Sequence, residues 1–592
     1  MGNPLIVAGR ATHQWTECAR GRPRTCGGGG PARAFVWLLV DTFCAALICL
    51  GCGHPKAVAA AIGAPESAIP LLFPVLVDGK VGYIDRNGRL VIQPSYDPIV
   101  SPDVPGSTGG PGLEGAVYWA ARFREGRAVV RRGERFGYID TSGNPVTPFA
   151  FDRAWGFEGR CAVVRVGGKT GLIDAKGQWL VDAQLDEISS PSQEEKPSGL
   201  MVYRKGASAG VLDAGGRVLV EVEADECFPV SDRLFGFRRE GVWGLADGNG
   251  RIVQAPAYAW LLCPEGRKFL AGKAGKWGFL DKESGKAVGE IRYDGRPKFF
   301  GPLIRVRLDG KCGYVDREGR PVLPPEWDKC GPPADGMIPV RRADLWGFAD
   351  VAGRVVAEPQ FGDAGGFSEG HAPVKVGGIW GYVGKDGRLA IAAQFGEAGP
   401  FSEGVACVRK GDGWGIVDAA GGFRRVPQAE RLWPCSEGRI LACLAGKYGF
   451  ADAEGNVAIK PDFDGIMAQQ RGASEVMGFV KGLAVVRIGD RYGIINRDGV
   501  LTAPAVLQRE VASGLRFCEG MARVTSNGRY GFVGGEGNLA IAPVFDAADD
   551  FRGGLAAVNV GGKSESRPFL RVTGGKWGYI DKSGAYVWQP TQ

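Results

Sequence analysis

Histidine is almost absent from this chain. Only His13, His54 and His371 occur among its 592 residues, and His371 is the single one beyond the N-terminal region. It follows a Phe-Ser-Glu-Gly segment that we expect to precede a strand, so we predict a surface position for it. This scarcity argues against histidine-dependent catalytic triads and histidine-rich metal sites.

Paired cysteine motifs are also lacking beyond the N-terminal region. None of the cysteines after residue 52 forms a CxxC pair, which argues against a zinc site in the body of the chain. Five precede residue 53 and the remaining nine are an odd number, so no disulfide framework is predicted. Several stand where other segments of the chain carry a hydrophobic residue, as Cys435 does. We therefore expect buried free thiols.

A concentrated basic surface is missing as well. The formal charge is +7, and five arginines against two acids place +3 of it in residues 1–52. No basic cluster interleaves with aromatic residues as a nucleic-acid-binding groove requires. No phosphate-binding glycine loop joins a strand to a helix. We therefore predict no nucleic acid among the partners and no cofactor.

The N-terminus contains one long apolar run, residues 34–52 (AFVWLLVDTFCAALICLGC). It follows an arginine-bearing segment, which is the layout of a secretory signal. Its end, Leu50-Gly51-Cys52, resembles a bacterial lipoprotein processing site, with Cys52 as the lipidated residue. We therefore expect a leader at 1–52, a tether at 53–70, and export to the cell envelope as a lipoprotein or a periplasmic or secreted protein. Two alternatives remain: a membrane-spanning anchor, and a cytoplasmic protein with a mis-assigned start.

Glycine, in contrast, is abundant, with 96 residues or about twice its average share. It recurs at fixed places, and internal repeats decide the architecture of such a chain. Eight of thirteen intervals between the marker glycines are 34 or 35 residues, and insertions fall near Ser101–Glu114, Ile466–Met477 and Gly561–Thr573. The marker glycines of the fourteen copies are Gly82, Gly137, Gly171, Gly210, Gly244, Gly278, Gly313, Gly347, Gly381, Gly415, Gly449, Gly493, Gly531 and Gly578.

Each copy predicts three short strands joined by tight turns. One copy has β-prone runs at 405–408 and 414–418 around a turn at 410–413, and its neighbour has a third run at 388–392. Half of the copies have a proline twelve residues after the marker glycine. We expect this proline to end the third strand, because it cannot donate to a ladder. No helical periodicity occurs in the body, so the predicted fold class is all-β.

Aromatic residues recur fourteen residues after the marker glycine in most copies and fourteen residues before it in about half. A small meander cannot bury its hydrophobic face alone, so these side chains predict a core shared between neighbouring copies. The residue before the marker is tryptophan in six copies, but Thr170 and Ala209 also occur there. A ligand-stacking tryptophan would not tolerate such replacement, so we predict a packing role for Trp243, Gly244, Trp277, Gly278, Trp346, Gly347, Trp380, Gly381, Trp414, Gly415, Trp577 and Gly578.

Two carboxylates also recur at fixed positions. An Asp follows the marker glycine by three residues in eleven copies, with Asp281 as the example in the most regular copy, and a Glu returns in the Phe-x-Glu-Gly opening. Rows of carboxylates can bind calcium, and a close pair can act as in glycosidases. A catalytic pair is needed once rather than in every copy, so we expect each Asp to hydrogen-bond its own turn. No catalytic, cofactor-binding or metal-binding residue is predicted.

These motifs together resemble the WG-repeat family, also called KWG repeats. The pattern F-x-E-G-x-A-x-V, then G-K-W-G-[YF]-[IV]-D, then G-x-x-[VI]-I-x-P-x-[FY] extends over about residues 75–590. The departures are Gly384, Asn496 and Gly534, where the motif Asp is missing, and the copies at Gly171 and Gly210, which lack the Trp. The resemblance implies a bacterial, often envelope-associated β-repeat scaffold with a binding or structural role.

The resulting expectation is an array of about 14 antiparallel β-meander repeats over residues 71–592. Fourteen copies are too many for one ring of four to eight blades, so the repeats stack either as propeller-like rings, possibly two, or as an open β-spiral. We expect a non-enzymatic scaffold for an unknown protein or glycan. The alternatives are a hydrolase-like enzyme with its active site in Ser101–Glu114 or Gly561–Thr573, and an intracellular scaffold.

Overall fold

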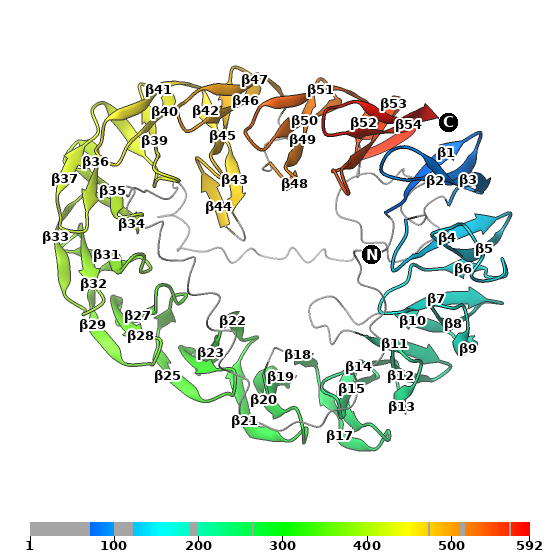
Figure 1. Cartoon of the computed structure of the whole chain (residues 1–592). Coiled ribbons are helices and arrows are strands. Elements are labelled where there is room, and N and C mark those ends of the chain that lie inside the picture. Colours follow the sequence, from blue (N-terminus) through cyan, green and yellow to red (C-terminus); the bar gives the residue numbers. More distant parts are fainter. Residues whose placement is uncertain are drawn as a thin grey trace, which may run out of the picture. The chain divides into compact units, whose positions relative to one another are not determined.

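The computed structural model describes residues 71–99, 122–189, 199–262, 266–471, 474–508, 515–566 and 570–591, and the only regular structure in these ranges is β (Figure 1). The predicted leader with Cys52, the tether at 53–70 and the insertion Ser101–Glu114 lie outside the described residues. The described part of the chain divides into two compact units: unit 1 lies within 330–516 and 533–539, and unit 2 lies within 71–329, 517–532 and 540–591.

Unit 2 contains the sheets at both ends of the described array. Residues 533–539, from the end of β50 to the start of β51, are assigned to unit 1 although the rest of their sheet belongs to unit 2. Its strands are β1 Phe73–Val77, β2 Lys80–Ile84, β3 Leu90–Tyr96, β4 Arg127–Arg132, β5 Arg135–Asp140, β6 Arg153–Ala154, β7 Cys161–Val166, β8 Lys169–Asp174, β9 Trp179–Leu185, β10 Glu187–Ser189, β11 Leu200–Lys205, β12 Ser208–Asp213, β13 Val218–Glu223, β14 Glu226–Pro229, β15 Leu234–Arg239, β16 Val242–Asp247, β17 Ile252–Tyr258, β18 Trp260–Leu262, β19 Lys268–Lys273, β20 Lys276–Asp281, β21 Ala287–Asp294, β22 Lys298–Phe300, β23 Leu303–Leu308, β24 Lys311–Asp316, β25 Pro321–Trp327, β48 Phe517–Cys518, β49 Met521–Ser526, β50 Arg529–Gly534, β51 Leu539–Phe545, β52 Ala547–Ala548, β53 Leu555–Ser566, β54 Leu570–Asp581 and β55 Tyr586–Thr591.

Unit 1 contains the sheets between them. Its strands are β26 Lys329–Cys330, β27 Met337–Arg342, β28 Leu345–Asp350, β29 Val355–Phe361, β30 Asp363–Ala364, β31 His371–Val376, β32 Ile379–Gly384, β33 Leu389–Phe395, β34 Glu397–Ser402, β35 Val405–Lys410, β36 Gly413–Asp418, β37 Phe423–Arg425, β38 Ala429–Leu432, β39 Ile440–Leu444, β40 Lys447–Ala451, β41 Val457–Phe463, β42 Gly465–Ile466, β43 Ala468–Arg471, β44 Ser474–Met477, β45 Leu483–Ile488, β46 Arg491–Asn496 and β47 Leu501–Leu507.

Each repeat forms one small antiparallel sheet. Every marker glycine lies in a strand of a different sheet, which confirms the fourteen copies and the all-β repeat fold. Twelve of these sheets have four strands, so the prediction of three strands per copy is wrong. The additional strand comes first in each sheet and is as short as Asp363–Ala364 in β30. A two-residue strand has no hydrophobic periodicity, which is why the sequence pattern did not indicate it.

The prolines twelve residues after the marker glycine do not end the third predicted strand. Pro256, Pro325, Pro359 and Pro461 lie inside β17, β25, β29 and β41, two residues before each strand ends. These strands occupy the edge of their sheets, so the missing N–H of proline removes no ladder bond. The expectation failed because it treated this strand as an interior one.

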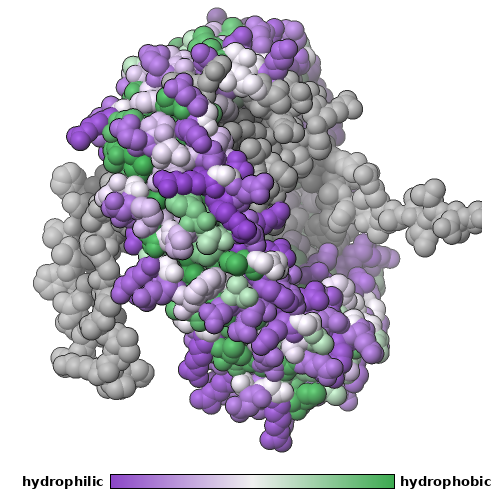
Figure 2. Space-filling view, turned by 90° about the vertical axis from the view of Figure 1, so that its right-hand side faces the viewer, coloured by the Kyte–Doolittle hydropathy of each residue, from purple (hydrophilic) through white to green (hydrophobic). Residues whose placement is uncertain are grey.

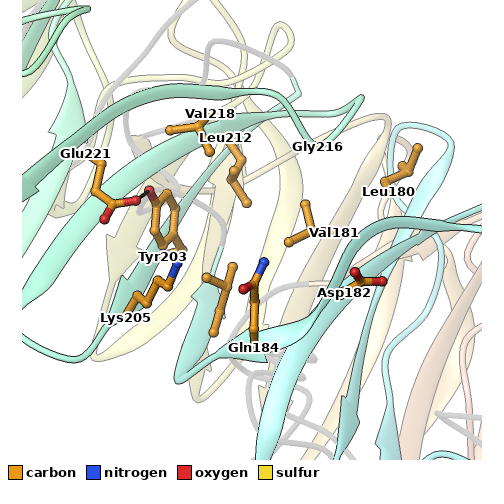
Figure 3. A pocket seen from close by; sticks show the side chains of 11 residues that line it. Leu180, Val181, Asp182, Gln184, Tyr203, Lys205, Leu212, Gly216, Val218 and Glu221 are labelled. Atoms are coloured by element: carbon orange, nitrogen blue, oxygen red, sulfur yellow. Dashed lines mark hydrogen bonds between the residues drawn. The ribbon is translucent and has the colours of Figure 1, made fainter.

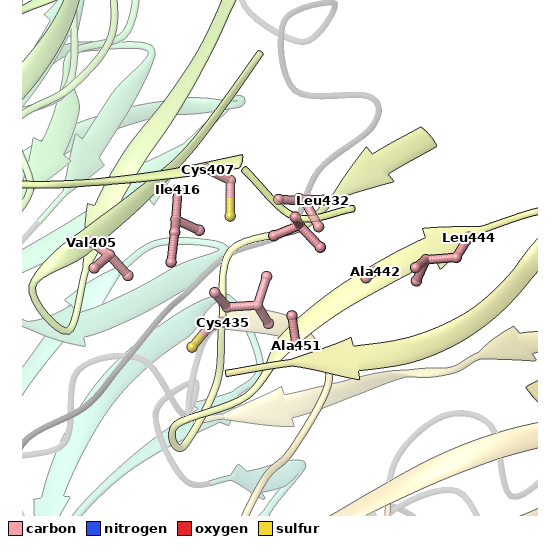
Figure 4. Close-up of a cluster of buried hydrophobic side chains, with 10 residues drawn as sticks. Val405, Cys407, Ile416, Leu432, Cys435, Ala442, Leu444 and Ala451 are labelled. Carbon is pink, nitrogen blue, oxygen red and sulfur yellow. The ribbon is translucent and has the colours of Figure 1, made fainter. Parts of the chain in front are cut away.

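Neighbouring sheets share their hydrophobic cores, as the recurring aromatic residues predicted. Around the Gly347 copy, Trp346, Phe348 and Phe361 pack with Phe367 and Val374 of the following copy. The next contact repeats the arrangement with Trp380, Tyr382, Phe395, Phe401 and Val408. Between the following copies, Cys407 and Cys435 lie among aliphatic side chains, and Cys435 is fully buried in the place of the usual aromatic residue (Figure 4).

The cysteines of the described residues include both free and disulfide-bonded ones. Cys161, Cys227, Cys407 and Cys435 are buried free thiols, as predicted, whereas Cys443 and Cys518 are partly exposed. The expectation is wrong for Cys312 and Cys330, which are disulfide-bonded. Cys263 lies outside the described residues.

The first and last described sheets pack against each other within unit 2. Phe73, Val75 and Ile84 share a core with Leu555 and Tyr579, and the Tyr579 hydroxyl donates to the Pro74 carbonyl at 3.0 Å. Arg122 also forms an ion pair with Asp549 at 2.9 Å.

Polar side chains cover most of the described surface seen in Figure 2, and hydrophobic side chains form small separate groups there. Several exposed hydrophobic residues share one place, near the start of the edge strand of their sheet: Val91, Trp179, Val218, Ile252, Leu389, Val457, Leu501 and Tyr586. In the described ranges, no helix has the length and apolar character needed to cross a membrane.

Candidate functional site

The marker glycine lies at a bulge where the next strand of its own sheet comes very close. At Gly347, an added Cβ would lie 2.4 Å from the Ala357 carbonyl oxygen and 2.8 Å from the Pro359 nitrogen. The pairing register shifts at this point, between Trp346 and Phe348. The same approach of backbone atoms to within 3.0 Å of an added Cβ occurs at Gly82, Gly313, Gly381, Gly449, Gly531 and Gly578. Any side chain here would force two strands apart.

The motif tryptophans are not open stacking platforms. Trp277, Trp346 and Trp380 are buried, and Trp243, Trp414 and Trp577 are partly buried. Each side chain belongs to, or packs against, a core shared with a neighbouring copy. Arg341 lies over Trp346 and Lys375 over Trp380, at 5.8 and 5.7 Å from the ring centres. Little aromatic surface therefore remains for a ligand.

The motif Asp binds the backbone of its own turn. Asp85 Oδ1 accepts the N–H groups of Asn87 and Arg89, both at 2.9 Å. The same pair of N–H groups, two and four residues on, is bound at Asp140, Asp174, Asp213, Asp247, Asp316, Asp350, Asp418, Asp452 and Asp581, and by the amide oxygen of Asn496. Asp281 binds Glu283, Ser284 and also Lys268 Nζ, and the Lys268 bond is the main reason its pKa is strongly lowered.

The opening Glu connects one repeat to the next. Glu519 Oε1 and Oε2 accept the N–H groups of Gly553 and Gly554, and Glu125 binds Gly159 and Arg160 in the same way. Equivalent bonds are made by Glu369, Glu403 and Glu437, and by Asp335 in the copy with a shorter acid. We call this series of bonds the glutamate ladder.

A further acid, absent from our sequence predictions, connects repeats on another side. Asp294 accepts Lys276 Nζ of its own copy at 2.5 Å and the Gly310 N–H of the following turn at 3.2 Å. The Lys hydrogen bond, followed by the Gly N–H, lowers the pKa of Asp294. Asp97, Asp186 and Asp464 repeat both contacts. The signal was present in the sequence as an Asp directly after the recurring large hydrophobic residue (Tyr96, Leu185, Tyr293 or Phe463) and a Lys two residues before the marker glycine.

The structure does not bring the predicted motif residues together into one centre. His371 lies at a strand start, where its Nδ1 is 3.0 Å from the Glu369 carbonyl oxygen. In the described part of the chain, no group of three or more His, Cys, Asp or Glu side chains is arranged to hold a metal ion. The insertions at Ile466–Met477 and Gly561–Thr573 form hairpins, β43–β44 and the outer parts of β53–β54.

One cavity lies between neighbouring repeats in unit 2. It has a volume of about 260 Å³ and opens between the edge strands β9 and β13 (Figure 3). Its polar lining comprises Asp182, Gln184, Tyr203, Lys205 and Glu221, and its apolar lining comprises Leu180, Val181, Leu185, Leu212 and Val218. The Tyr203 hydroxyl donates to the Glu221 carboxylate at 2.7 Å.

Comparison with known proteins agrees with the repeats. The family model described as "WG containing repeat" matches residues 82–100, 136–169, 171–195, 313–346, 346–378, 380–414, 448–468 and 530–563. No curated protein has a significantly similar sequence.

Solved structures resemble the chain only distantly. The extracellular domain of a putative one component system from B. thetaiotaomicron is 8% identical, with 89% of this chain and 97% of that chain covered and a TM-score of 0.22. The extracellular domain of a putative hybrid two component system from the same organism is 9% identical, with 87% and 77% covered and a TM-score of 0.20. A eukaryotic initiation factor is 13% identical, with 61% and 97% covered and a TM-score of 0.24. TM-scores of this size carry no argument about function.

Proposed function

We propose that this chain, whose repeats belong to the WG containing repeat family, is a non-enzymatic scaffold that presents its variable surface to a protein or glycan partner. The observation that supports this function is how the repeated groups are used. The marker glycine allows close approach of the next strand, the motif Asp binds its own turn, and the opening Glu binds the next repeat. These groups hold the array together, so partner recognition falls to residues that differ between copies.

Large exposed side chains that differ between copies are candidates for such contacts. Trp260 in β18 is 59% exposed, and it pairs with Gly272 where other copies have an acid paired with a cation, such as Glu226 with Arg238. Phe299 in the neighbouring β22 is 40% exposed. Aromatic side chains of this kind are enriched in the parts of interfaces that contribute most to affinity.

The test compares a surface variant with a motif variant in the full chain. Immobilised protein is exposed to envelope extract and to a glycan array, and saturable binding of a defined partner is expected. Trp260→Ala should weaken binding without changing the thermal midpoint if β18 takes part, whereas Trp346→Ala should lower the midpoint. Turnover of a substrate, lost on substitution of an exposed acid with the midpoint unchanged, would instead establish an enzyme.

Export is the second part of this proposal. The apolar run at 34–52 supports it, and the disulfide-bonded state of Cys312 and Cys330 supports it independently, because disulfides persist in oxidising compartments. Cell fractionation should find the protein in the envelope, and globomycin should cause a precursor to accumulate if Cys52 is lipidated. Alkylation before and after reduction should label Cys312 and Cys330 only after reduction. Cytoplasmic protein with both thiols free would refute export.

A further inference from the structure

The contact between the Gly171 and Gly210 repeats is filled by smaller side chains than the contact between the Gly347 and Gly381 repeats. In the Gly347 copy, Trp346 pairs with Phe361 across the sheet, and both pack against the next repeat. The corresponding pair in the Gly171 copy is Thr170 and Leu185. Two large aromatic side chains are thus replaced by smaller ones at the same register, and Leu185 of this pair lines a cavity between the repeats.

The Gly210 repeat compensates for only part of this loss. Tyr203 occupies the position that is Val374 or Val408 in other copies, opposite the marker glycine, and it is buried against Leu185 and Leu212. Burial, followed by the hydrogen bond to Glu221, raises the pKa of Tyr203, so its hydroxyl stays protonated and remains a donor. Tyr203 and Leu185 both line the cavity of about 260 Å³ between β9 and β13.

The lining of this cavity combines apolar walls with polar groups of several kinds. In Figure 3, Tyr203, Lys205 and Glu221 lie on one side, and Val181 and Gln184 face them from the neighbouring strand. Carboxylates accept hydrogen bonds, an ammonium group donates them, and an amide does both. The lining contains both signs of charge, with Lys205 on one side and the carboxylates of Asp182 and Glu221, so neither an anion nor a cation meets a field of one sign.

These properties select the class of ligand. Pockets for drug-sized molecules have volumes of about 300–1,000 Å³, and an extended peptide needs a longer groove than 260 Å³ supplies. A neutral ring with several hydroxyl groups would use the mixed donors and acceptors, and its C–H faces would pack against Val181 and Leu212. We propose that the cavity between β9 and β13 binds one neutral pyranose ring, the terminal sugar of a glycan. This inference rests on the proposed scaffold function and specifies its ligand class.

The test uses the full chain and methyl glycosides of neutral hexoses, such as glucose, galactose and mannose. Binding is measured by saturation-transfer NMR and titration calorimetry for the native chain and three variants. Thr170→Trp introduces the residue found in six copies opposite Leu185, which lines the cavity, and we expect the larger ring to displace Leu185 into it. Gln184→Ala removes a polar group from its exposed rim. Gln360→Ala is the matched control, because Gln360 has the same place in the Gly347 copy, where Trp346 and Phe361 fill the contact.

At least one glycoside should bind the native chain saturably and the Gln360→Ala variant equally well. Thr170→Trp should abolish this binding, and Gln184→Ala should weaken it at least tenfold with an unchanged thermal midpoint. No binding by any glycoside would overturn the proposal, as would equal binding by the native chain and Gln184→Ala, or equal loss in Gln360→Ala. If the cavity binds no glycoside, the full chain can still bind a partner through another surface in the binding test of the proposed function. Failure of the cavity proposal and failure of the scaffold function are therefore distinguishable.

Discussion

Glu437 offers the sharpest test of the glutamate ladder. Its backbone has φ of 55°, a region that costs a side-chain-bearing residue about 1–2 kcal/mol and favours glycine. The carboxylate accepts the Lys481 N–H at 2.7 Å and the Gly482 N–H at 2.6 Å, and it pairs with Arg497 at 2.8 Å. A glutamate in this conformation is explained if its side chain stabilises the contact between repeats by more than the backbone strain costs.

The expected magnitudes follow from these contacts. A hydrogen bond to a charged group contributes about 1.5–3 kcal/mol net, and an ion pair with the half-exposed Arg497 about 0–1 kcal/mol. Lys481 is exposed, so water replaces part of what is lost and the lower values apply. Glu437→Ala should therefore destabilise the contact by about 2–4 kcal/mol, and Glu437→Gln by about 1–2 kcal/mol because the amide keeps one acceptor. Glu437→Gly should cost about 1 kcal/mol less than Glu437→Ala, since it relieves the strain.

Hydrogen exchange is the appropriate assay, because a repeat array need not unfold in one step. In Glu437→Ala, the amides of Lys481 and Gly482 should exchange about 30- to 1,000-fold faster, given 1.36 kcal/mol for each factor of ten. Glu454→Ala is the control, because that exposed residue interacts through its backbone N–H with Asp452. Unchanged exchange in Glu437→Ala would refute the ladder, and equal effects of the Ala and Gly variants would refute the strain argument.

The ladder also predicts a pH dependence. Burial by itself would raise the pKa of Glu437, but the Arg497 hydrogen bond and the two backbone N–H groups outweigh it and lower the pKa below 4.5. A folded-state pKa below the unfolded value means that the ionised form stabilises the fold. This stabilisation is present above pH 4.5 and is lost as the pH falls through the lowered folded value. The difference in exchange between the native chain and Glu437→Gln should therefore disappear in acid, and a constant difference would contradict it.

Three further substitutions test other contacts. Gly347→Ala should lower the free energy of unfolding by about 1–3 kcal/mol through overpacking, because the added Cβ would meet the Ala357 carbonyl oxygen at 2.4 Å. Gly362→Ala is the control in the same thermal scan and should be nearly neutral, because the nearest atom to its added Cβ is at 3.8 Å. Asp549→Asn should leave the thermal midpoint at pH 7 unchanged or raise it, because burial raises the pKa of Asp549 despite Arg122, so ionisation of Asp549 opposes folding. Any gain should vanish below pH 4, where the carboxyl is protonated in the unfolded chain as well. A lower midpoint at pH 7 would show instead that the ion pair is net stabilising. Asp294→Ala should lower the midpoint more than Lys276→Met, because Asp294 also accepts the Gly310 N–H, and the reverse order would show that the cation matters more than the turn.

The sequence predicted the parts of the fold that depend on one position at a time. A glycine that recurs at a fixed distance from an aromatic residue predicts a place where two strands come close together. At Gly347 and Gly381, backbone atoms of the next strand lie too close for a side chain. The aromatic partners of the shared cores, such as Trp346 and Phe361, followed from burial alone. What was missed depends on pairs of positions. Lys276 and Asp294 are 18 residues apart, and only the antiparallel return of β21 beside β20 makes them neighbours.

The same distinction explains why the cavity was not predicted. Thr170 and Ala209 were recognised as departures from the motif, and their tolerance was evidence that the motif Trp serves packing. A replacement that merely repacks would leave no space, but the structure shows Thr170 paired with Leu185, which lines a cavity together with Tyr203. Because every regular repeat uses its motif residues for contacts within the array, a site that differs from the others has to arise where those contacts are incomplete. Departures from the repeat are therefore the positions at which function should be sought first in this chain.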